Sequence, residues 1–233
     1  MREKEWLKAN LKMFKFFKIF KLVKKIPKTS WSSKKPLNVN PKIKTLLFLI
    51  LGLFLFGLGE TLLLASGGGV SPWTVLAEGI SIHSSYSIGW STFWMSLAVL
   101  LLWIPLKQKP GIGTILNVII IALVFDYTLP YLPNPENYGF KVLQVIIGVL
   151  ITGLGSGFYL ISNLGPGPRD GLMTGVQRIT GKPIALVRST IEVIVVFFGW
   201  KLGGTVGLGT IIFALGIGPT VAAGIYFVSK NFK

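Results

Sequence analysis

Long apolar runs separated by short polar segments make up the chain after its first forty or so residues. An α-helix needs about 20 apolar residues to cross the roughly 30 Å of hydrocarbon in a bilayer. Six runs approach or exceed that length, and they cover about residues 44–66, 88–106, 112–129, 142–162, 185–202 and 208–228. The pattern therefore predicts an all-α membrane protein with six transmembrane helices.

The apolar runs repeat at a fixed interval. The segment Gly165–Gly175 falls on Gly69–Gly79 when it is shifted back by 96 positions, and the same shift aligns further glycine motifs without a gap. Chance does not readily supply such an ordered set in one register, so we interpret it as an internal repeat. Each repeat holds three spans, and an odd number makes the second repeat inverted in the membrane. The expected domains are repeat 1 at 44–130, an external loop at 131–140 and repeat 2 at 141–229.

Each repeat also contains a segment that is too short to cross, at residues 72–81 and 168–178. Both segments begin with proline after Ser71 or Gly167, a combination that favours the start of a helix. Two arrangements stay open: the short helices dip back into the bilayer, or they lie on its surface. Re-entrant helices would bring two partially positive N-termini to the membrane centre. Val75 and Gly171 would then line one water-accessible path.

Charge is divided unequally between the predicted loops. Fourteen of the 24 Lys and Arg residues precede residue 45, and with a cytoplasmic N-terminus 22 lie inside and only Lys141 and Lys201 lie outside. This asymmetry follows the positive-inside rule. It predicts a multi-pass protein of the bacterial inner (plasma) membrane with a cytoplasmic tail and linker at 1–43 and a cytoplasmic C-terminus at 230–233.

The first 26 or so residues interleave lysines with aromatic and aliphatic side chains. One interpretation is an amphipathic helix that binds anionic lipid of the inner leaflet. The other is a basic tail that only sets the topology. In both, the net charge of +16 indicates a membrane surface as the partner and not a nucleic acid.

Composition narrows the chemistry further. The chain is 51% hydrophobic and 14% charged, has no cysteine, and has a single histidine, His83. These values are typical of a membrane protein and argue against disulfides and multi-histidine metal sites. The glycine-rich segments adjoin apolar spans and not a strand–turn–helix unit, so they predict no nucleotide-binding loop. We expect no enzyme activity, no cofactor and no metal.

Ionisable residues within or next to the spans are candidates for a solute site, because such groups are costly in a bilayer and usually face a partner or a water-filled path. Arg188 and Glu192 are one helical turn apart and can form a structural ion pair. Glu60 has no basic neighbour in sequence, and its structural alternative is a protonated, hydrogen-bonded carboxyl group. The candidate solute-binding residues are Glu60, Pro72, Glu78, Asp126, Pro168, Arg169, Asp170, Arg188 and Glu192.

The acidic positions are not duplicated by the repeat. The shift of 96 places Glu60 on Ser156, Glu192 on Ser96 and Arg188 on Thr92. We therefore expect an asymmetric site on a symmetric frame.

Several strings resemble the YczE/YyaS/YitT family of bacterial integral membrane proteins, most of all its YczE branch. They are Val70-Ser71-Pro72-Trp73-Thr74-Val75-Leu76, Gln108-Lys109-Pro110-Gly111-Ile112-Gly113-Thr114 and Gly165-Pro166-Gly167-Pro168-Arg169-Asp170-Gly171-Leu172-Met173. The resemblance covers roughly residues 45–225 and excludes the basic tail. It implies an inner-membrane protein without catalytic residues to transfer, and a link to lipopeptide antibiotic production.

Two functions follow as hypotheses. The first is a carrier or export channel for a small polar or anionic solute, built on the inverted repeat. The alternative is a non-transporting accessory or regulatory protein of the membrane that binds lipid or partner proteins. Internal symmetry and acidic residues within the spans favour the first, and the short chain keeps the second open.

Overall fold

A computed structural model describes residues 26–232, and this part of the chain consists of eight α-helices and one 3-10 turn joined by loops. The helices are α2 (Ile43–Ser66), α3 (Pro72–His83), α4 (Ile88–Leu101), α5 (Ile112–Thr128), α6 (Tyr138–Ser162), α7 (Pro168–Thr180), α8 (Ile184–Lys201) and α9 (Leu208–Asn231), with the turn η1 at Leu129–Tyr131. The expected all-α class is confirmed. The tail helix expected from residue 1 onward lies outside the described residues.

Four spans of the described residues are long and apolar enough to cross a bilayer: α2, α6, α9, and α5 continued by η1. The other two expected spans fall short of this. Helix α4 has 14 residues, or about 21 Å at 1.5 Å per residue. Helix α8 has 18 residues but carries Arg188, Glu192 and Lys201. Length and composition thus support four of the six predicted spans.

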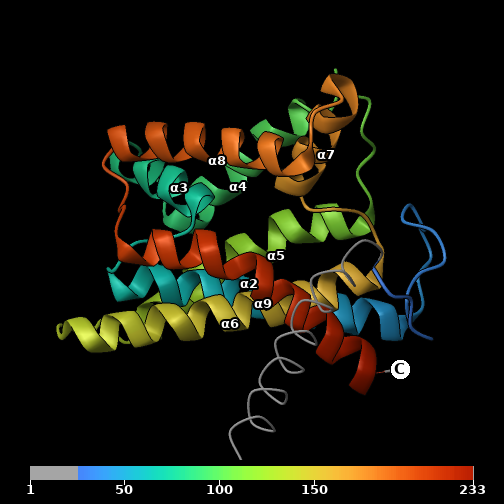
Figure 1. Cartoon of the computed structure of the whole chain (residues 1–233), viewed down its shortest axis with the longest axis horizontal. Coiled ribbons are helices and arrows are strands. Elements are labelled where there is room, and N and C mark those ends of the chain that lie inside the picture. The colour runs from blue at the N-terminus through green and yellow to red at the C-terminus, as the bar shows by residue number, and fades with distance from the viewer. Residues whose placement is uncertain (1–25, 233) are drawn as a thin grey trace, which may run out of the picture.

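The long helices form one layer, with α2 and α6 packed against each other, α5 on α2 and α9 on α6 (Figure 1). Glycines allow the central pair to approach closely. A Cβ on Gly52 would lie 2.8 Å from the Gly155 carbonyl oxygen, and one on Gly148 would lie 2.7 Å from that of Gly59. Any larger residue at these positions would force the backbones apart.

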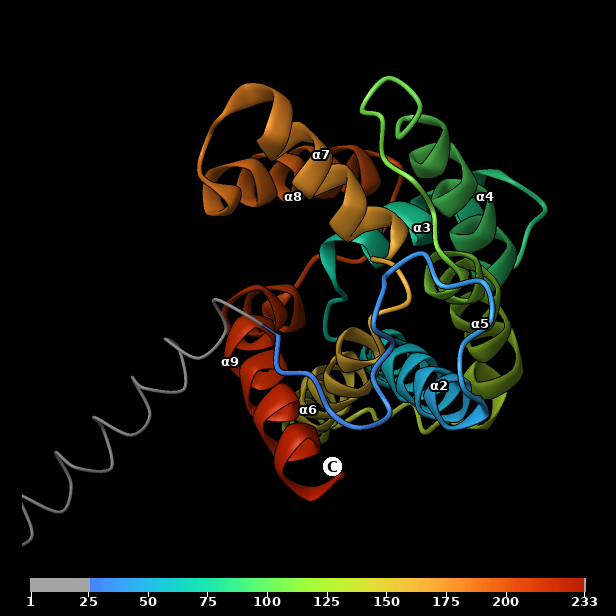
Figure 2. The same ribbon diagram turned by 90° about the vertical axis from the view of Figure 1, so that its right-hand side faces the viewer.

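Helices α3, α4, α7 and α8 form a second layer over the first (Figure 2). Helix α3 packs on α8, and α4 packs on α7. Their shared core consists of buried aromatic and aliphatic side chains, namely Trp73, Ala77, Met95, Val99, Leu172, Met173 and Val195. This layer contains both short helices, so its packing decides where their N-termini lie.

Helix starts follow the interval of 96 residues found in the sequence: Pro72 and Pro168, Ile88 and Ile184, Ile112 and Leu208. Contacts between the two halves also recur at this interval. A hydrogen bond from the second half to the first has a counterpart from the first half to the second. The N–H of Gly209 donates to the Gly68 carbonyl at 2.8 Å, and the N–H of Gly113 donates to the Leu164 carbonyl at 2.7 Å. Counterpart helices also run in opposite directions, α2 against α6 and α5 against α9 (Figure 1).

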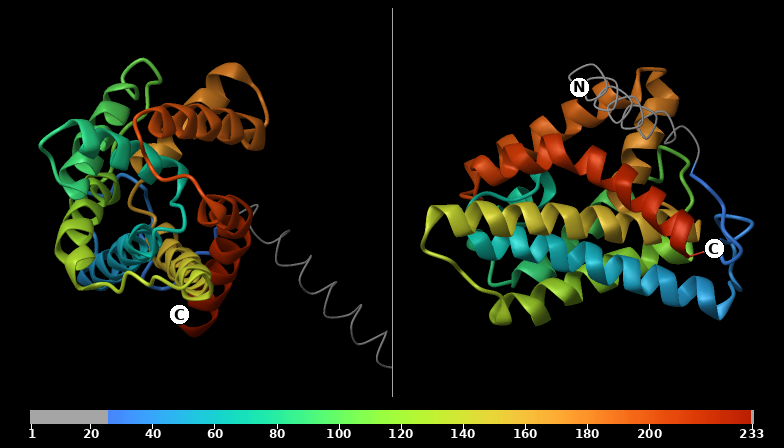
Figure 3. Two further views of the ribbon diagram at one scale, coloured as in Figure 1. Left: turned by 90° about the vertical axis from the view of Figure 1, so that its left-hand side faces the viewer. Right: turned by 60° about the horizontal axis from the view of Figure 1, so that its bottom comes forward.

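The interval breaks at one contact between the layers. Helix α4 packs along α5, whereas the described residues of their counterparts, α8 and α9, barely touch. Figures 2 and 3 show that α8 and α9 are separated, whereas α4 and α5, their counterparts in the other half, lie side by side. Helix α9 contains an internal proline, Pro219, where α5 has Leu123. The proline removes one backbone hydrogen bond, and α9 bends in its middle.

The segment before α2 packs on the helices although its sequence is that of a polar linker. Trp31 is buried, and its indole N–H donates to the Phe232 carbonyl. The N–H of Ser33 donates to the Ser162 carbonyl at 3.0 Å, next to the end of α6. This segment therefore joins the ends of α6 and α9.

Candidate functional site

A partly enclosed cavity of about 270 Å³ lies between the two layers, at the N-termini of α3 and α7. It has room for about nine water molecules at roughly 30 Å³ each. Both short helices begin at its wall and run toward opposite ends of the molecule (Figure 1). Their first residues, Pro72 and Pro168, are the ones predicted from sequence, and the helices extend to His83 and Thr180.

The wall of the cavity contains positions from both halves of the chain. Eight pairs of lining residues are separated by 96 positions: Glu60/Ser156, Ser71/Gly167, Pro72/Pro168, Trp73/Arg169, Thr92/Arg188, Ser96/Glu192, Asn117/Phe213 and Ile121/Ile217. The lining positions of the two halves thus correspond. Wherever one residue of such a pair is charged, its counterpart 96 positions away is uncharged. The charged residues of the wall are therefore distributed unequally between the corresponding positions of the two halves.

Glu60 is buried, with 1% of its surface exposed, and its carboxylate lies at the start of α3. The Oε2 atom accepts hydrogen bonds from Ser71 Oγ at 2.5 Å and Thr74 Oγ1 at 2.7 Å. Ser71 is the residue before the helix, yet its side chain bonds this carboxylate and not its own helix backbone. The carboxyl group of Glu60, from α2, is therefore held at the positive end of α3.

Three wall residues each carry a buried polar atom that has no hydrogen-bond partner within the described chain. They are Glu60 Oε1, Trp73 Nε1 and Thr92 Oγ1. Burying such an atom without a partner costs about 1–3 kcal/mol. Glu60, Trp73 and Thr92 thus bring polar groups without a partner in the described chain to the wall of the cavity.

Arg169 is the second residue of α7, and its guanidinium lies 5.5 Å from the centre of the Trp73 ring. Among residues 26–232 no acidic side chain lies within ion-pair distance of it. The neighbouring Asp170 accepts a hydrogen bond from the Tyr159 hydroxyl at 3.4 Å, and the Gly167 N–H donates to the same hydroxyl. Tyr159 thus anchors the start of α7, and Arg169 lines the cavity beside the Trp73 ring.

Arg188 and Glu192 form the expected ion pair on α8, with 2.8 Å between Nε and Oε1. Their side chains are 44% and 19% exposed, and both residues line the cavity. They stand on the side where α8 and α9 barely touch. On the α9 side of this opening, a Cβ added to Gly218 would meet no atom within 4 Å. The α8–α9 side is the loosest part of the wall.

Two candidate residues lie away from the cavity. Glu78 accepts hydrogen bonds from the N–H and the hydroxyl of Thr205, at 2.6 and 2.8 Å. Asp126 accepts from the Gly89 N–H at 2.8 Å and the Ser87 hydroxyl at 2.7 Å. Both carboxylates hold loops or helix starts of neighbouring elements, which is a structural task.

The residues expected to line the path on the short helices need a correction. Val75 is fully buried in a hydrophobic cluster, and Gly171 packs against the Trp103 indole. The cavity is lined instead by Trp73 and Arg169, each of which lies two residues nearer the start of its helix. The reason is packing, because the fourth residue of each short helix packs against neighbouring segments of the fold.

Sequence reasoning missed several polar wall residues, among them Trp73, Thr92, Ser96, Asn117 and Tyr159. A signal existed for three of them, because the repeat places Trp73 on Arg169, Thr92 on Arg188 and Ser96 on Glu192. Tyr159 has no such signal, since its counterpart is Leu63. Its position against Asp170 is visible only in the folded chain.

The long apolar helices α2, α6 and α9, and α5 continued by η1, are those of an integral membrane protein. A family model described as a family of unknown function, DUF6198, matches residues 43–225, and the chain belongs to that family.

Three relatives agree with this assignment. An uncharacterized protein of Haemophilus influenzae is 43% identical over 84% of this chain and 89% of its own length. The uncharacterized membrane protein YczE of Bacillus subtilis is 31% identical over 72% of this chain and 79% of its own length. The uncharacterized protein YyaS of the same organism is 23% identical over 70% and 83%. The expected relation to YczE and YyaS is confirmed, and no solved structure matches the chain.

Proposed function

We propose that this protein is a membrane carrier that binds a small polar solute in the cavity between its two layers. The observation that carries the proposal is the set of three buried polar atoms without partners at the converging N-termini of α3 and α7. In membrane carriers, broken or short helices that meet near the midplane commonly form the substrate site. A merely structural cavity of this size would be lined by apolar groups or by satisfied polar ones.

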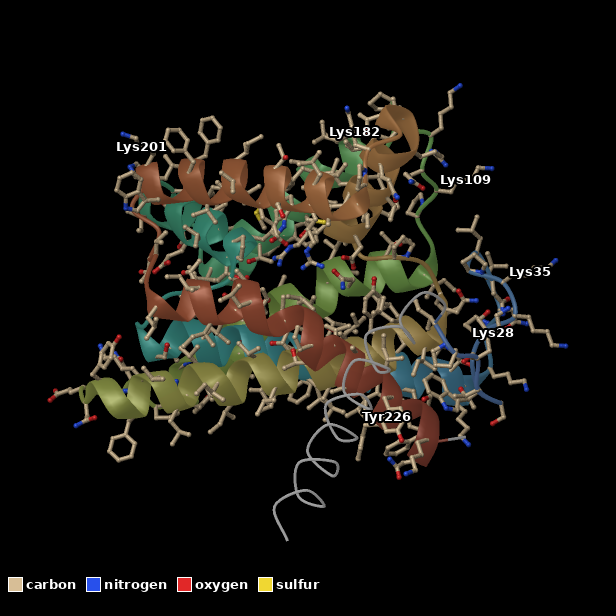
Figure 4. All side chains as sticks on the ribbon, in the orientation of Figure 1. Lys28, Lys35, Lys109, Lys182, Lys201 and Tyr226 are labelled. Atoms are coloured by element: carbon tan, nitrogen blue, oxygen red, sulfur yellow. The ribbon has the colours of Figure 1, made fainter. Side chains whose placement is uncertain are left out.

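In this proposal the two halves form an inverted repeat, and α4 and α8 complete six spans. The exchanged contacts and the opposite directions of counterpart helices support it. The charges support the orientation, since Lys28, Lys35, Lys109 and Lys182 lie toward one end of the long axis and Lys201 toward the other (Figure 4). The lysine-rich end faces the cytoplasm by the positive-inside rule.

Transport by alternating access requires one part of the protein to move against another around the bound solute. The layer of α3, α4, α7 and α8 is the candidate for the moving part, because the cavity lies along its boundary with the other layer. At this boundary α4 packs closely against α5, whereas α8 makes little contact with α9. We expect movement to be largest at the loose side.

The test is uptake by proteoliposomes of radiolabelled amino acids, carboxylic acids and sugars. Gly218→Trp adds a large side chain at a position that lines the cavity and where an added Cβ meets no atom within 4 Å. Its matched control is Leu215→Trp on the same helix, at a position that is 75% exposed and does not line the cavity. We expect Gly218→Trp to reduce uptake to the level of empty vesicles and Leu215→Trp to leave it unchanged.

The second candidate function is an accessory protein that holds a lipid. The separation of α8 and α9 favours it, because a cavity open on that side is accessible from the bilayer. Folded protein that admits no solute faster than empty vesicles, but co-purifies with a lipid that Gly218→Trp displaces, would support this alternative and contradict the carrier.

A further inference from the structure

The cavity holds charges of both signs. Arg188 and Glu192 neutralise each other at 2.8 Å. Apart from this pair, the Arg, Asp and Glu side chains of the wall are one guanidinium, Arg169, and two carboxyl groups, Glu60 and Asp170. Each of the two helix N-termini adds roughly half a positive charge. The site is therefore close to neutral as a whole but strongly polar locally.

This balance disfavours a ligand of one sign. A simple anion near Arg169 would also face Glu60 and Asp170, and desolvated like charges repel strongly in a low-dielectric site. A simple cation at Glu60 would face Arg169 and the positive end of α3. The site is complementary to a molecule that itself carries both signs.

The wall offers a set of hydrogen-bond donors on one residue, Arg169, and an acceptor without a partner in the described chain on another, Glu60. Arg169 has a fork of donors that is not paired with any acidic side chain among residues 26–232, and such a fork matches a carboxylate in two-pronged geometry. Glu60 has its Oε2 atom bonded by Ser71 and Thr74, while its Oε1 atom, with no partner, is an acceptor. An ammonium group supplies the donors that Oε1 lacks.

We propose that the cavity binds a small zwitterion, whose carboxylate pairs with Arg169 and whose primary ammonium group donates to Glu60 Oε1. This inference rests on the proposed function in that it names the class of solute of the same cavity. The cavity of about 270 Å³ has room for a solute of amino-acid size.

The experiment measures binding of six probes to the full chain in nanodiscs by isothermal calorimetry. Glycine, β-alanine and γ-aminobutyrate carry both charges at increasing separation, acetate and methylamine carry one charge each, and glycine betaine carries both but has no N–H donor. We expect at least one of the three primary zwitterions to bind about tenfold or more tightly than acetate, methylamine or betaine, because each charged hydrogen bond is worth at least that factor.

Two variants separate the two ends of the ligand. Glu60→Gln removes the charge at the ammonium end, so the preference over acetate falls to about one. Arg169→Gln removes the guanidinium, so the preference over methylamine falls instead. Arg169→Lys keeps a positive charge but lacks the planar guanidinium, so it should restore part of the preference for the zwitterion over methylamine. Arg178→Gln, near the far end of α7, is the control and should change neither preference, since Arg178 does not line the cavity.

The outcomes are distinct for this inference and for the carrier. Acetate that binds the folded protein as tightly as every zwitterion would overturn the zwitterion site, and uptake of that anion would leave the carrier standing. A zwitterion that binds with the expected variant pattern but never crosses proteoliposomes would contradict the carrier and support the site. Folded protein that binds none of the six probes would overturn the inference.

Discussion

The indole of Trp103 lies against Gly171, where a Cβ would overlap the ring, and its N–H donates to the Pro168 carbonyl at 3.0 Å. The counterparts of these two residues, 96 positions away, are Gly199 and Val75. They are also in contact, since a Cβ on Gly199 would lie 2.6 Å from the Val75 carbonyl carbon. At α7, the large Trp103 side chain packs on a glycine of the short helix. At α3, the glycine Gly199 of α8 packs on the backbone of the short helix. Both contacts position a helix start at the cavity.

Substitution of Gly171 should test this support. We expect Gly171→Ala to lower the free energy of unfolding by about 1–3 kcal/mol through overpacking against Trp103. Gly218→Ala, at a helical position with open space, is the matched control and should not lower it. Thermal unfolding of both variants in detergent measures the difference. Equal stability of the two would show that Trp103 does not restrain α7.

Glu60 depends on its two hydroxyl donors. Thr74→Val keeps the shape of the side chain but removes the 2.7 Å hydrogen bond to Oε2, which should cost about 1.5–3 kcal/mol for a charged acceptor. In a Glu60→Gln background the same change should cost less, because the acceptor is no longer charged. A double-mutant cycle of thermal stabilities measures this coupling. Strict additivity would mean that the Thr74 bond does not stabilise the carboxylate.

Asp126 should affect stability without affecting solute choice. Its carboxylate accepts from the N–H of Gly89 and from the hydroxyl of Ser87 at the start of α4. Asp126→Ala removes this cap and should cost about 0.5–2 kcal/mol. Glu136→Gln, in an exposed loop, is the control. A changed order of preference among the six binding probes would instead place Asp126 on the solute path.

Reporter fusions can decide between six spans and four. With six, sites after Lys109 and Lys233 lie in the cytoplasm and a site near Pro135 lies outside, as the charge asymmetry predicts. If only α2, α5, α6 and α9 crossed, the sites at Lys109 and Pro135 would exchange sides. An external signal at Lys109 would therefore exclude the inverted six-span arrangement.

Local physics explains what the sequence alone predicts correctly here. The lengths of the apolar runs determine the long helices, because hydrocarbon thickness and helix rise are constants. Proline at Pro72 and Pro168 marks two helix starts, since its missing N–H has no partner at that position anyway. The Arg188–Glu192 pair follows from helical geometry, which places residues four apart on one face.

Tertiary structure decides which polar groups share the cavity. Glu60 and Arg169 are 109 positions apart, and their common site depends on the packing of α2, α3 and α7. Glu78 and Asp126 have the same chemistry as Glu60, yet they bond Thr205 and the start of α4. Tyr159 reaches Asp170 only because α6 and the loop after it bring them together. The sequence shows which side chains are costly to bury. Which partner offsets that cost depends on how helices that are distant in sequence pack together.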